Sequence, residues 1–309
     1  MDKVDIIIPA YKPGEKFLAL IESLERQSVS VNQIIVMNTE QKYFDRLIYG
    51  TSFHKIYHNI TVKHISKREF DHGKTRNQGV KLSDADYFIM MTDDAVPADE
   101  YMVEELLGQL HKERVAVAYA RQLADENSSA VEKYTRNFNY PEESVIKTQE
   151  DLGRLGIKTF FCSNVCAAYN REIFDTLGGF VKHTIFNEDM VYAAKAVHAG
   201  YGIAYSAQAR VYHSHTFGYA EQFHRNFDLG VSQADHPEVF AAYPSESEGI
   251  RLVRLTIGHL TQIGMKRKIP HVILQSGFKY MGYQFGKHYR MLPRKMVIAM
   301  SSNKEYWGC

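Results

Sequence analysis

Two adjacent acids, Asp93 and Asp94, directly follow the apolar run at residues 87–92. Such a run predicts a buried strand, so both carboxylates are expected where that strand reaches solvent. Carboxylate oxygens are hard ligands suited to Mg²⁺ or Mn²⁺, and these ions commonly share their coordination with substrate phosphates. The pair therefore predicts a metal site for a phosphorylated substrate. An alternative stays open, because paired acids also end strands and begin the next helix.

The elements that position these acids follow a regular alternation. Five strands are predicted, with helices between several of them, at residues 5–8, 33–37, 61–65, 87–91 and 115–120. This alternation predicts an α/β protein with a mostly parallel central sheet flanked by helices. Ligands of such sheets bind outside the carboxyl ends of the strands. Because Pro9-Ala10-Tyr11, Asn38-Thr39-Glu40 and Asp93-Asp94 all follow strands, we expect them to line one cleft.

The chain after the fifth strand is less regular. Residues 121–160 are polar and poorly periodic, which predicts a mobile loop with some helix. Beyond it we expect a strand at 162–169, a short helix at 171–177 and a helix that begins at Asn187-Glu188-Asp189. Acids at a helix start are explained by capping and the helix dipole alone, so their position does not decide whether they act in catalysis.

The composition is that of a globular protein with a sizeable core. The 309 residues are 45% hydrophobic and 24% charged, which fits one large domain with an appendage. The start lacks a basic segment followed by an apolar one, so we expect a cytoplasmic protein. The three cysteines have no paired CxxC spacing, which argues against a disulfide framework or structural zinc.

Charge is distributed unevenly along the chain. Residues 251–309 carry eleven Lys and Arg against the single acid Glu305, although the whole chain has a net charge of only +1. A basic segment interleaved with apolar residues predicts binding to an anionic membrane surface. A helical subdomain with a solvated basic face is the alternative. No nucleic-acid partner is expected, because no nucleic-acid-binding motif accompanies the charge.

A set of short motifs occurs in a fixed order along roughly the first three quarters of the chain. They are Pro9-Ala10-Tyr11, residues 70–79, Thr92-Asp93-Asp94-Ala95, Ser163-Asn164-Val165, Gly178-Gly179-Phe180, Glu188-Asp189 and His213-Ser214-His215. In this order they resemble the inverting GT-A glycosyltransferases of family two. Within that family the chain is most similar to bacterial rhamnosyltransferases, including the type that builds streptococcal rhamnose polysaccharides.

The resemblance implies a GT-A catalytic domain at residues 1–245. The charge and apolar pattern predict a basic, amphipathic, helical segment at 246–309. Within the catalytic domain, residues 1–120 would bind the nucleotide sugar and residues 121–245 the acceptor. The donor-binding residues that it implies are Pro9, Ala10, Tyr11, Asn38, Asp71, His72, Lys74, Arg76 and Asp93. For Lys74 an exposed position on an amphipathic helix remains equally open.

The metal and catalytic residues follow from the same resemblance. Asp94 matches the acid that binds Mg²⁺ or Mn²⁺, and His213 or His215 is expected to complete the ligand shell. On a strand, two histidines spaced by one residue would point to the same face, which also allows simple packing. Asp189 matches the catalytic base. Ser163, Asn164 and Glu188 are candidate acceptor-binding residues, with a positioning role as the alternative for Glu188.

The function implied is transfer of L-rhamnose, with inversion, from dTDP-β-L-rhamnose to a hydroxyl of a lipid-linked saccharide in cell-surface polysaccharide biosynthesis. The protein would act at the inner face of the cell membrane. Three alternatives remain, namely a transferase using another UDP- or dTDP-sugar, a metal-dependent nucleotidyltransferase and a catalytically silent nucleotide- or glycan-binding module. A nucleotidyltransferase would be favoured by a Gly-rich phosphate loop, which residues 11–14 do not provide.

Overall fold

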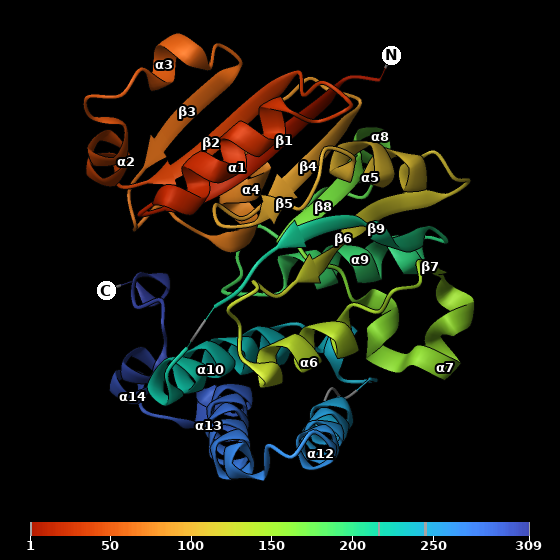
Figure 1. Cartoon of the computed structure of the whole chain (residues 1–309). Coiled ribbons are helices and arrows are strands. Elements are labelled where there is room, and N and C mark those ends of the chain that lie inside the picture. The colour runs from red at the N-terminus through yellow and green to blue at the C-terminus, as the bar shows by residue number, and fades with distance from the viewer. Residues whose placement is uncertain (1, 216, 244–245, 309) are drawn as a thin grey trace. The chain divides into compact units, whose positions relative to one another are not determined.

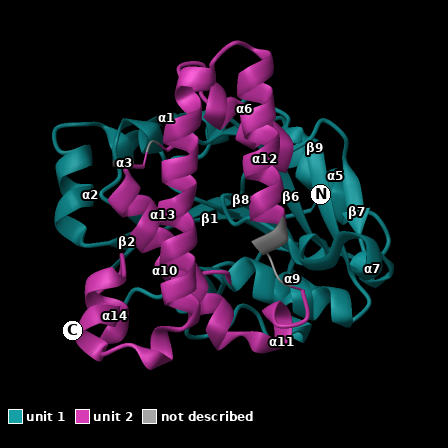
Figure 2. Ribbon diagram, turned by 90° about the horizontal axis from the view of Figure 1, so that it is seen from below, with its two compact units in different colours: residues 1–123, 140–183, 188–213 teal, residues 124–139, 184–187, 214–309 magenta. Residues whose placement is uncertain are grey.

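The computed structural model describes residues 2–215, 217–243 and 246–308. The chain forms two compact units (Figure 2). The first contains residues 1–123, 140–183 and 188–213, and the second contains residues 124–139, 184–187 and 214–309. The second unit therefore includes the whole predicted C-terminal segment, but it also takes three earlier pieces of the chain.

The first unit is built on a nine-stranded sheet (Figure 1). Its strands are β1 (Val4–Tyr11), β2 (Gln33–Thr39), β3 (Ile60–Ile65), β4 (Tyr87–Met91), β5 (Val96–Pro97), β6 (Val115–Leu123), β7 (Val145–Lys147), β8 (Cys166–Asn170) and β9 (Gly202–Tyr212). The order is β3-β2-β1-β4-β8-β6-β9-β5, and β7 pairs with β9 outside this path. Strands β1 to β4 pair in parallel, as do β6 and β9, whereas β8 is antiparallel to β4 and β6. All five predicted strands are present, and the predicted mostly parallel α/β sheet is confirmed.

Helices cover both faces of this sheet. In the first unit they are α1 (Glu15–Glu25), α2 (Gln41–Ile48), α3 (Phe53–Ile56), α4 (His72–Val80), α5 (Met102–Leu110), α7 (Leu152–Leu155), α8 (Arg171–Thr176) and α9 (Glu188–His198). Because successive residues of a strand point to opposite faces, β1 serves two cores. Ile6 and Ile8 share one apolar cluster with α1, whereas Ile7 meets α4 on the other face.

Two glycines allow α4 to approach its neighbours closely. A Cβ at Gly79 would come within 2.5 Å of the Ile7 side chain, and one at Gly73 within 1.8 Å of the Val181 carbonyl oxygen. Any side chain at these positions would push the helix away. The glycines therefore determine where the donor-site residues predicted on α4 lie within the first unit.

Two local predictions were wrong and a third was right only in part. Residues 121–160 contain the predicted helix, as α6 (Ala130–Asn139), α7 and the 3-10 helices η1 (Gln149–Asp151) and η2 (Gly156–Phe160), but they also contain the end of β6 and strand β7. The strand predicted at 162–169 begins only at Cys166, since a turn closed by the bond from its N–H to the Ser163 carbonyl precedes it. Strand β9 ends at Tyr212, so His213 and His215 follow a strand and do not lie on one.

The second unit is helical in its described part. Besides α6 it contains α10 (Tyr219–Asp235), α11 (Pro237–Phe240), α12 (Glu246–Gln262), α13 (Ile269–Lys287), α14 (Arg294–Met300) and the 3-10 helices η3 (Lys266–Lys268), η4 (Tyr289–Met291) and η5 (Glu305–Trp307). Helices α10 and α13 pack along Gly230, Gly282 and Gly286, where an added Cβ would come within 2.0 to 2.3 Å of a backbone carbonyl oxygen of the opposite helix. Among the described residues, no helix is both long and apolar enough to cross a bilayer.

Candidate active site

The carboxyl ends of β1, β2 and β4 bring the predicted donor residues to one edge of the sheet. Tyr11, the last residue of β1, pairs with Thr39 at the end of β2. Its backbone N–H also donates to Asp93 Oδ2 at 3.1 Å, just beyond the end of β4. Two segments separated by 82 residues therefore meet as predicted. Burial, with Asp94 beside it, raises the pKa of Asp93 to about 7.

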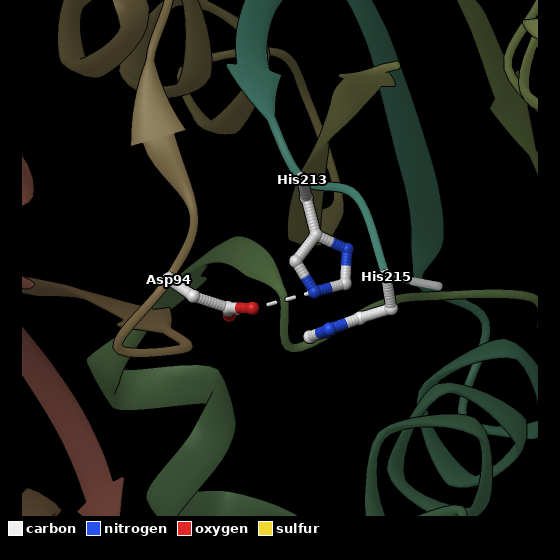
Figure 3. A group of neighbouring side chains, drawn as sticks. All are labelled: Asp94, His213 and His215. Atoms are coloured by element: carbon white, nitrogen blue, oxygen red, sulfur yellow. Dashed lines mark ion pairs between the residues drawn. The ribbon is translucent and has the colours of Figure 1, made fainter. Parts of the chain in front are cut away.

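Asp94 lies against His213, which follows β9 (Figure 3). Asp94 Oδ1 is 3.5 Å from His213 Nε2. His213 Nδ1 lies 3.1 Å from Gln122 Oε1, and because that oxygen can only accept, Nδ1 carries the proton. The Nε2 lone pair consequently faces Asp94, as a metal-ligating histidine requires.

These side chains fit a divalent cation. Asp94, His213 and His215 each offer one ligand atom, and the three atoms all lie within 4.8 Å of one another. One carboxylate oxygen with two imidazole nitrogens suits Mn²⁺ better than Mg²⁺, which prefers an all-oxygen shell. Substrate phosphates and water would have to supply the remaining ligands. One of the two histidines was predicted to complete the ligand shell, and this arrangement allows either His213 or His215 to do so.

Asp189 stands in the first turn of α9 and is held by backbone donors. Its Oδ2 accepts from the Asn164 N–H at 3.0 Å, and its Oδ1 accepts from the Met190 N–H at 2.8 Å. Burial, followed by the neighbouring charge of Glu188, raises the pKa of Asp189 to about 7. A carboxylate with this pKa is well suited to accept a proton near neutral pH.

Glu188 is buried in an ion pair with a residue of α4. Arg76 Nε lies 3.2 Å from Glu188 Oε1, and His72 Nδ1 lies 3.8 Å from Glu188 Oε2. Burial by itself raises the pKa of Glu188, but Arg76 and His72 outweigh it and hold that pKa below its ordinary value. Of the predicted donor contacts on α4, His72 and Arg76 are thus brought next to the predicted base.

The other α4 residues have different surroundings. Asp71 is the N-cap of α4, and its Oδ1 accepts from the N–H groups of Gly73 and Lys74 at 2.9 Å each. Its Oδ2 lies 2.9 Å from His183 Nδ1. Lys74 is exposed. The geometry favours a structural role for Asp71, and the alternative of a solvated position for Lys74 remains open.

Tyr11 belongs to a cluster of tyrosines and lysines at the ends of β1 and β3. Its exposed ring meets the Tyr43 ring edge to face, with centroids 5.7 Å apart. The ammonium groups of Lys12 and Lys67 lie 5.3 and 5.1 Å from the Tyr11 centroid. Aromatic faces flanked by cations can hold an anionic nucleotide. Sequence reasoning missed Tyr43 and Lys67, which no spacing rule connects to Tyr11.

Pro9, Ala10 and Asn38 are less accessible than Tyr11. Ala10 and Asn38 are buried where β1 and β2 pair, and the Asn38 amide lies 2.9 Å from His64 Nδ1. Backbone contacts therefore suit Pro9 and Ala10 better than side-chain contacts. His64 engages Asn38 Nδ2, whereas Asn38 Oδ1 is buried without a hydrogen-bond partner among the described residues, so that oxygen is the atom suited to the predicted donor contact.

Ser163 and Asn164, the predicted acceptor contacts, lie between the metal ligands and the base. Gln122 Nε2 donates to Ser163 Oγ at 3.0 Å. Asn164 is buried, and its amide is used at both ends, by Tyr169 and by Glu188. This arrangement favours a positioning role for Asn164 and leaves Ser163 as the better candidate for contact with an acceptor. The glycines at 178 and 179 have positive φ, and Phe180 is buried, so local packing explains the motif that they form.

A continuous series of contacts joins the two predicted reactive sites within the first unit. It runs from Asp94 to His213, from His213 to Gln122 and from Gln122 to Ser163. The next residue, Asn164, donates its backbone N–H to Asp189. Gln122 was missed from the sequence, although its place near the end of β6 puts it at an edge where ligands bind.

The family follows from comparison with known proteins. A model of the family described as glycosyl transferase family 2 matches residues 5–178. The chain belongs to glycosyl transferase family 2. The predicted family and the predicted class of enzyme, a glycosyltransferase, are thereby confirmed.

Two curated relatives of this family-2 glycosyltransferase match nearly its whole length. The O-antigen chain rhamnosyltransferase RfbN of Salmonella typhimurium is 36% identical over 308 residues, covering 99% of this chain and 96% of the relative. The O-antigen chain rhamnosyltransferase WbaN of Salmonella anatum is 36% identical over 311 residues, covering 100% of this chain and 96% of the relative. The resemblance to bacterial rhamnosyltransferases is confirmed.

Solved structures support the predicted GT-A fold. The mannosyltransferase PcManGT of Pyrobaculum calidifontis, in complex with GDP-Man and Mn²⁺, aligns with a TM-score of 0.57 at 12% identity, covering 99% of this chain and 85% of that chain. TarS residues 1–349 of S. aureus, in complex with UDP-GlcNAc, aligns with a TM-score of 0.53 at 14% identity, covering 94% and 92%. At these identities the likeness concerns the fold of this family-2 glycosyltransferase.

Proposed function

We propose that the protein transfers L-rhamnose from dTDP-β-L-rhamnose, with inversion, to a hydroxyl of a lipid-linked saccharide in cell-surface polysaccharide biosynthesis. Both curated relatives are named O-antigen chain rhamnosyltransferases. The main support for a transfer reaction is the series of contacts between Asp94 and Asp189. These contacts link a set of candidate metal ligands to a carboxylate whose pKa is raised.

The roles of the residues follow from this framework. Asp94, His213 and His215 would hold Mn²⁺ or Mg²⁺, and the bound ion would offset charge that develops on the departing nucleotide diphosphate. Tyr11, with Tyr43 and the nearby lysines, is suited to the nucleoside end of the donor. Inversion requires a base on the side of the sugar opposite the leaving group, and we assign that role to Asp189.

A panel of nucleotide sugars tests donor and reaction class together. Purified protein with Mn²⁺ is offered dTDP-β-L-rhamnose, UDP-glucose, UDP-GlcNAc and GDP-mannose, with and without membrane extract, and release of nucleoside diphosphate is followed. We expect release to depend on the extract and to be fastest, by about tenfold or more, with dTDP-rhamnose, since polar discrimination between substrates commonly exceeds that factor. Proton NMR of the product should show an α-L-rhamnoside. Faster release from another donor would contradict the choice of sugar.

We further propose that the enzyme acts at the inner face of the cell membrane and docks on anionic lipid through its C-terminal segment. Residues 249–304 contain eleven Lys and Arg and no Asp or Glu. While one face of α13 packs on α10, five large side chains of the helix are 40% to 56% exposed, and these are Ile273, Leu274, Tyr280, Met281 and Phe285. Cationic residues beside an exposed apolar stripe are typical of a helix that lies in the membrane interface.

Replacing Tyr280 by glutamate tests this docking. The substitution puts a negative charge into the exposed stripe. We therefore expect the partition constant onto vesicles containing phosphatidylglycerol, at low salt, to fall by about tenfold or more. Co-sedimentation measures the effect. Tyr49→Glu, which changes a 90% exposed tyrosine of the first unit, is the matched control and should bind like wild type. Equal binding of the Tyr280 variant would contradict the assignment of the surface.

A further inference from the structure

We propose that Glu188 is a positioning residue whose negative charge tunes the neighbouring base, and that Arg76 holds Glu188 ionised and does not bind the donor diphosphate. This assignment takes the positioning alternative for Glu188 and departs from the donor contact predicted for Arg76. It rests on the proposed function, because it concerns the base of that reaction.

Glu188 and Arg76 already use each other as partners. Their side chains are 5% and 7% exposed, and Arg76 Nε lies 3.2 Å from Glu188 Oε1. The same oxygen accepts from Asn164 Nδ2 at 2.9 Å, while Oε2 faces His72. Arg76 Nη1 also donates to the His72 carbonyl oxygen at 3.0 Å. A substrate could reach the Glu188 carboxylate or Arg76 Nη1 only by replacing these contacts.

The burial of this ion pair calls for a reason other than stability. Removing two charges from water is costly, and buried pairs are often no more stabilising than apolar residues of similar volume. Here the pair connects the second turn of α4 with the first turn of α9, where Asp189 lies. A fixed negative charge next to the base gives the pair a function that does not depend on its contribution to stability.

Asn164 holds both acids of the pair Glu188-Asp189. Its backbone N–H donates to Asp189 Oδ2 at 3.0 Å, and its side-chain amide donates to Glu188 Oε1 at 2.9 Å. The Tyr169 hydroxyl donates to Asn164 Oδ1 at 2.6 Å, which determines the orientation of the amide. Both carboxylates are therefore fixed relative to one backbone segment.

Few groups other than Glu188 can influence the charge state of Asp189. Arg76 acts on it from α4, and the buried Cys162 thiol and Tyr169 phenol act from the segment around β8. His72 faces Glu188. Burial raises the pKa of both Cys162 and Tyr169, so these groups are neutral near pH 7. Glu188 is thus the anionic neighbour that opposes ionisation of Asp189 and makes it a stronger base.

Glu188→Gln separates this role from substrate binding. Glutamine keeps the size and an oxygen for Asn164 but removes the charge. In protein carrying ¹³C-labelled aspartate, the carboxyl signal that Asp189→Asn abolishes should titrate about one pH unit lower, or more, in Glu188→Gln than in wild type. The acidic limb of kcat/KM against pH should move by the same amount, with KM for donor unchanged.

Two variants complete the test. Glu188→Asp keeps the charge and should restore the Asp189 midpoint to within a few tenths of a unit of wild type, even if it lowers the rate. Glu172→Gln changes an exposed acid of α8 and should alter neither titration nor rate. An unchanged Asp189 midpoint in Glu188→Gln, together with a raised KM for acceptor or donor, would overturn the proposal. The NMR titration needs no substrate, so it stands apart from any failure of dTDP-rhamnose in the donor panel.

Discussion

Replacing Asp189 by asparagine is expected to lower kcat for sugar transfer by about 1,000-fold, within the range that general base catalysis usually contributes. Asparagine cannot take the proton of the attacking hydroxyl. Nucleotide-sugar affinity, measured by titration calorimetry with Mn²⁺ present, should change by less than about threefold, since the base is not assigned a donor contact. Thermal unfolding should remain cooperative, because the variant keeps one oxygen for a backbone donor.

The pH dependence of the wild-type enzyme provides a second test of this base. Because burial and Glu188 raise the pKa of Asp189 to about 7, the carboxyl is protonated below that pH and cannot act as a base. We therefore expect kcat/KM to rise tenfold per pH unit below about 7 and to level off above it. Asp175→Asn, which changes an exposed acid of α8, is the matched control and should keep both the rate and the profile. Undiminished turnover by Asp189→Asn would reject the assignment of the base.

Replacing Asp94 by asparagine is expected to weaken Mn²⁺ binding and to lower kcat/KM by about 100-fold or more. A bound cation contributes several kcal/mol to stabilising the charge of the transition state, and each 1.4 kcal/mol is a factor of ten. An amide oxygen is a weaker ligand than a carboxylate for such an ion. Electron paramagnetic resonance of free Mn²⁺ measures the affinity directly, without any sugar donor.

Asp84→Asn is the control for the Asp94 variant. Asp84 is an exposed acid that pairs with Lys3, and it takes no part in the ligand set. Its replacement should leave the Mn²⁺ titration as in wild type. If Asp94→Asn also gave the wild-type titration, the cation would have to bind elsewhere and the metal site proposed around His213 would be wrong.

Much of the fold follows from local patterns in the chain. The apolar runs at residues 6–8, 34–37 and 87–91 predict strands buried on both faces, because only a central strand can bury every side chain of such a run. The carboxyl ends of parallel strands lie at the same edge of a sheet, which predicts that Tyr11 lies near Asp93. The 3.1 Å hydrogen bond between them confirms this. Residues 121–160 were assigned too little regular structure because β7, η1 and α7 are each only three or four residues long. Elements this short have too few positions to show a period.

The sequence by itself determined the family, the parallel sheet and the acids that follow its strands, since these depend on residue types and on spacings of a few positions. Only the tertiary structure decided how the acids are used. Arg76 meets Glu188, and Gln122 sets the proton of His213, across separations of 112 and 91 residues. Such pairings depend on the order of the strands and on how closely helices pack, as α4 does at Gly73 and Gly79. A local sequence pattern carries no information about which distant side chain will be the neighbour.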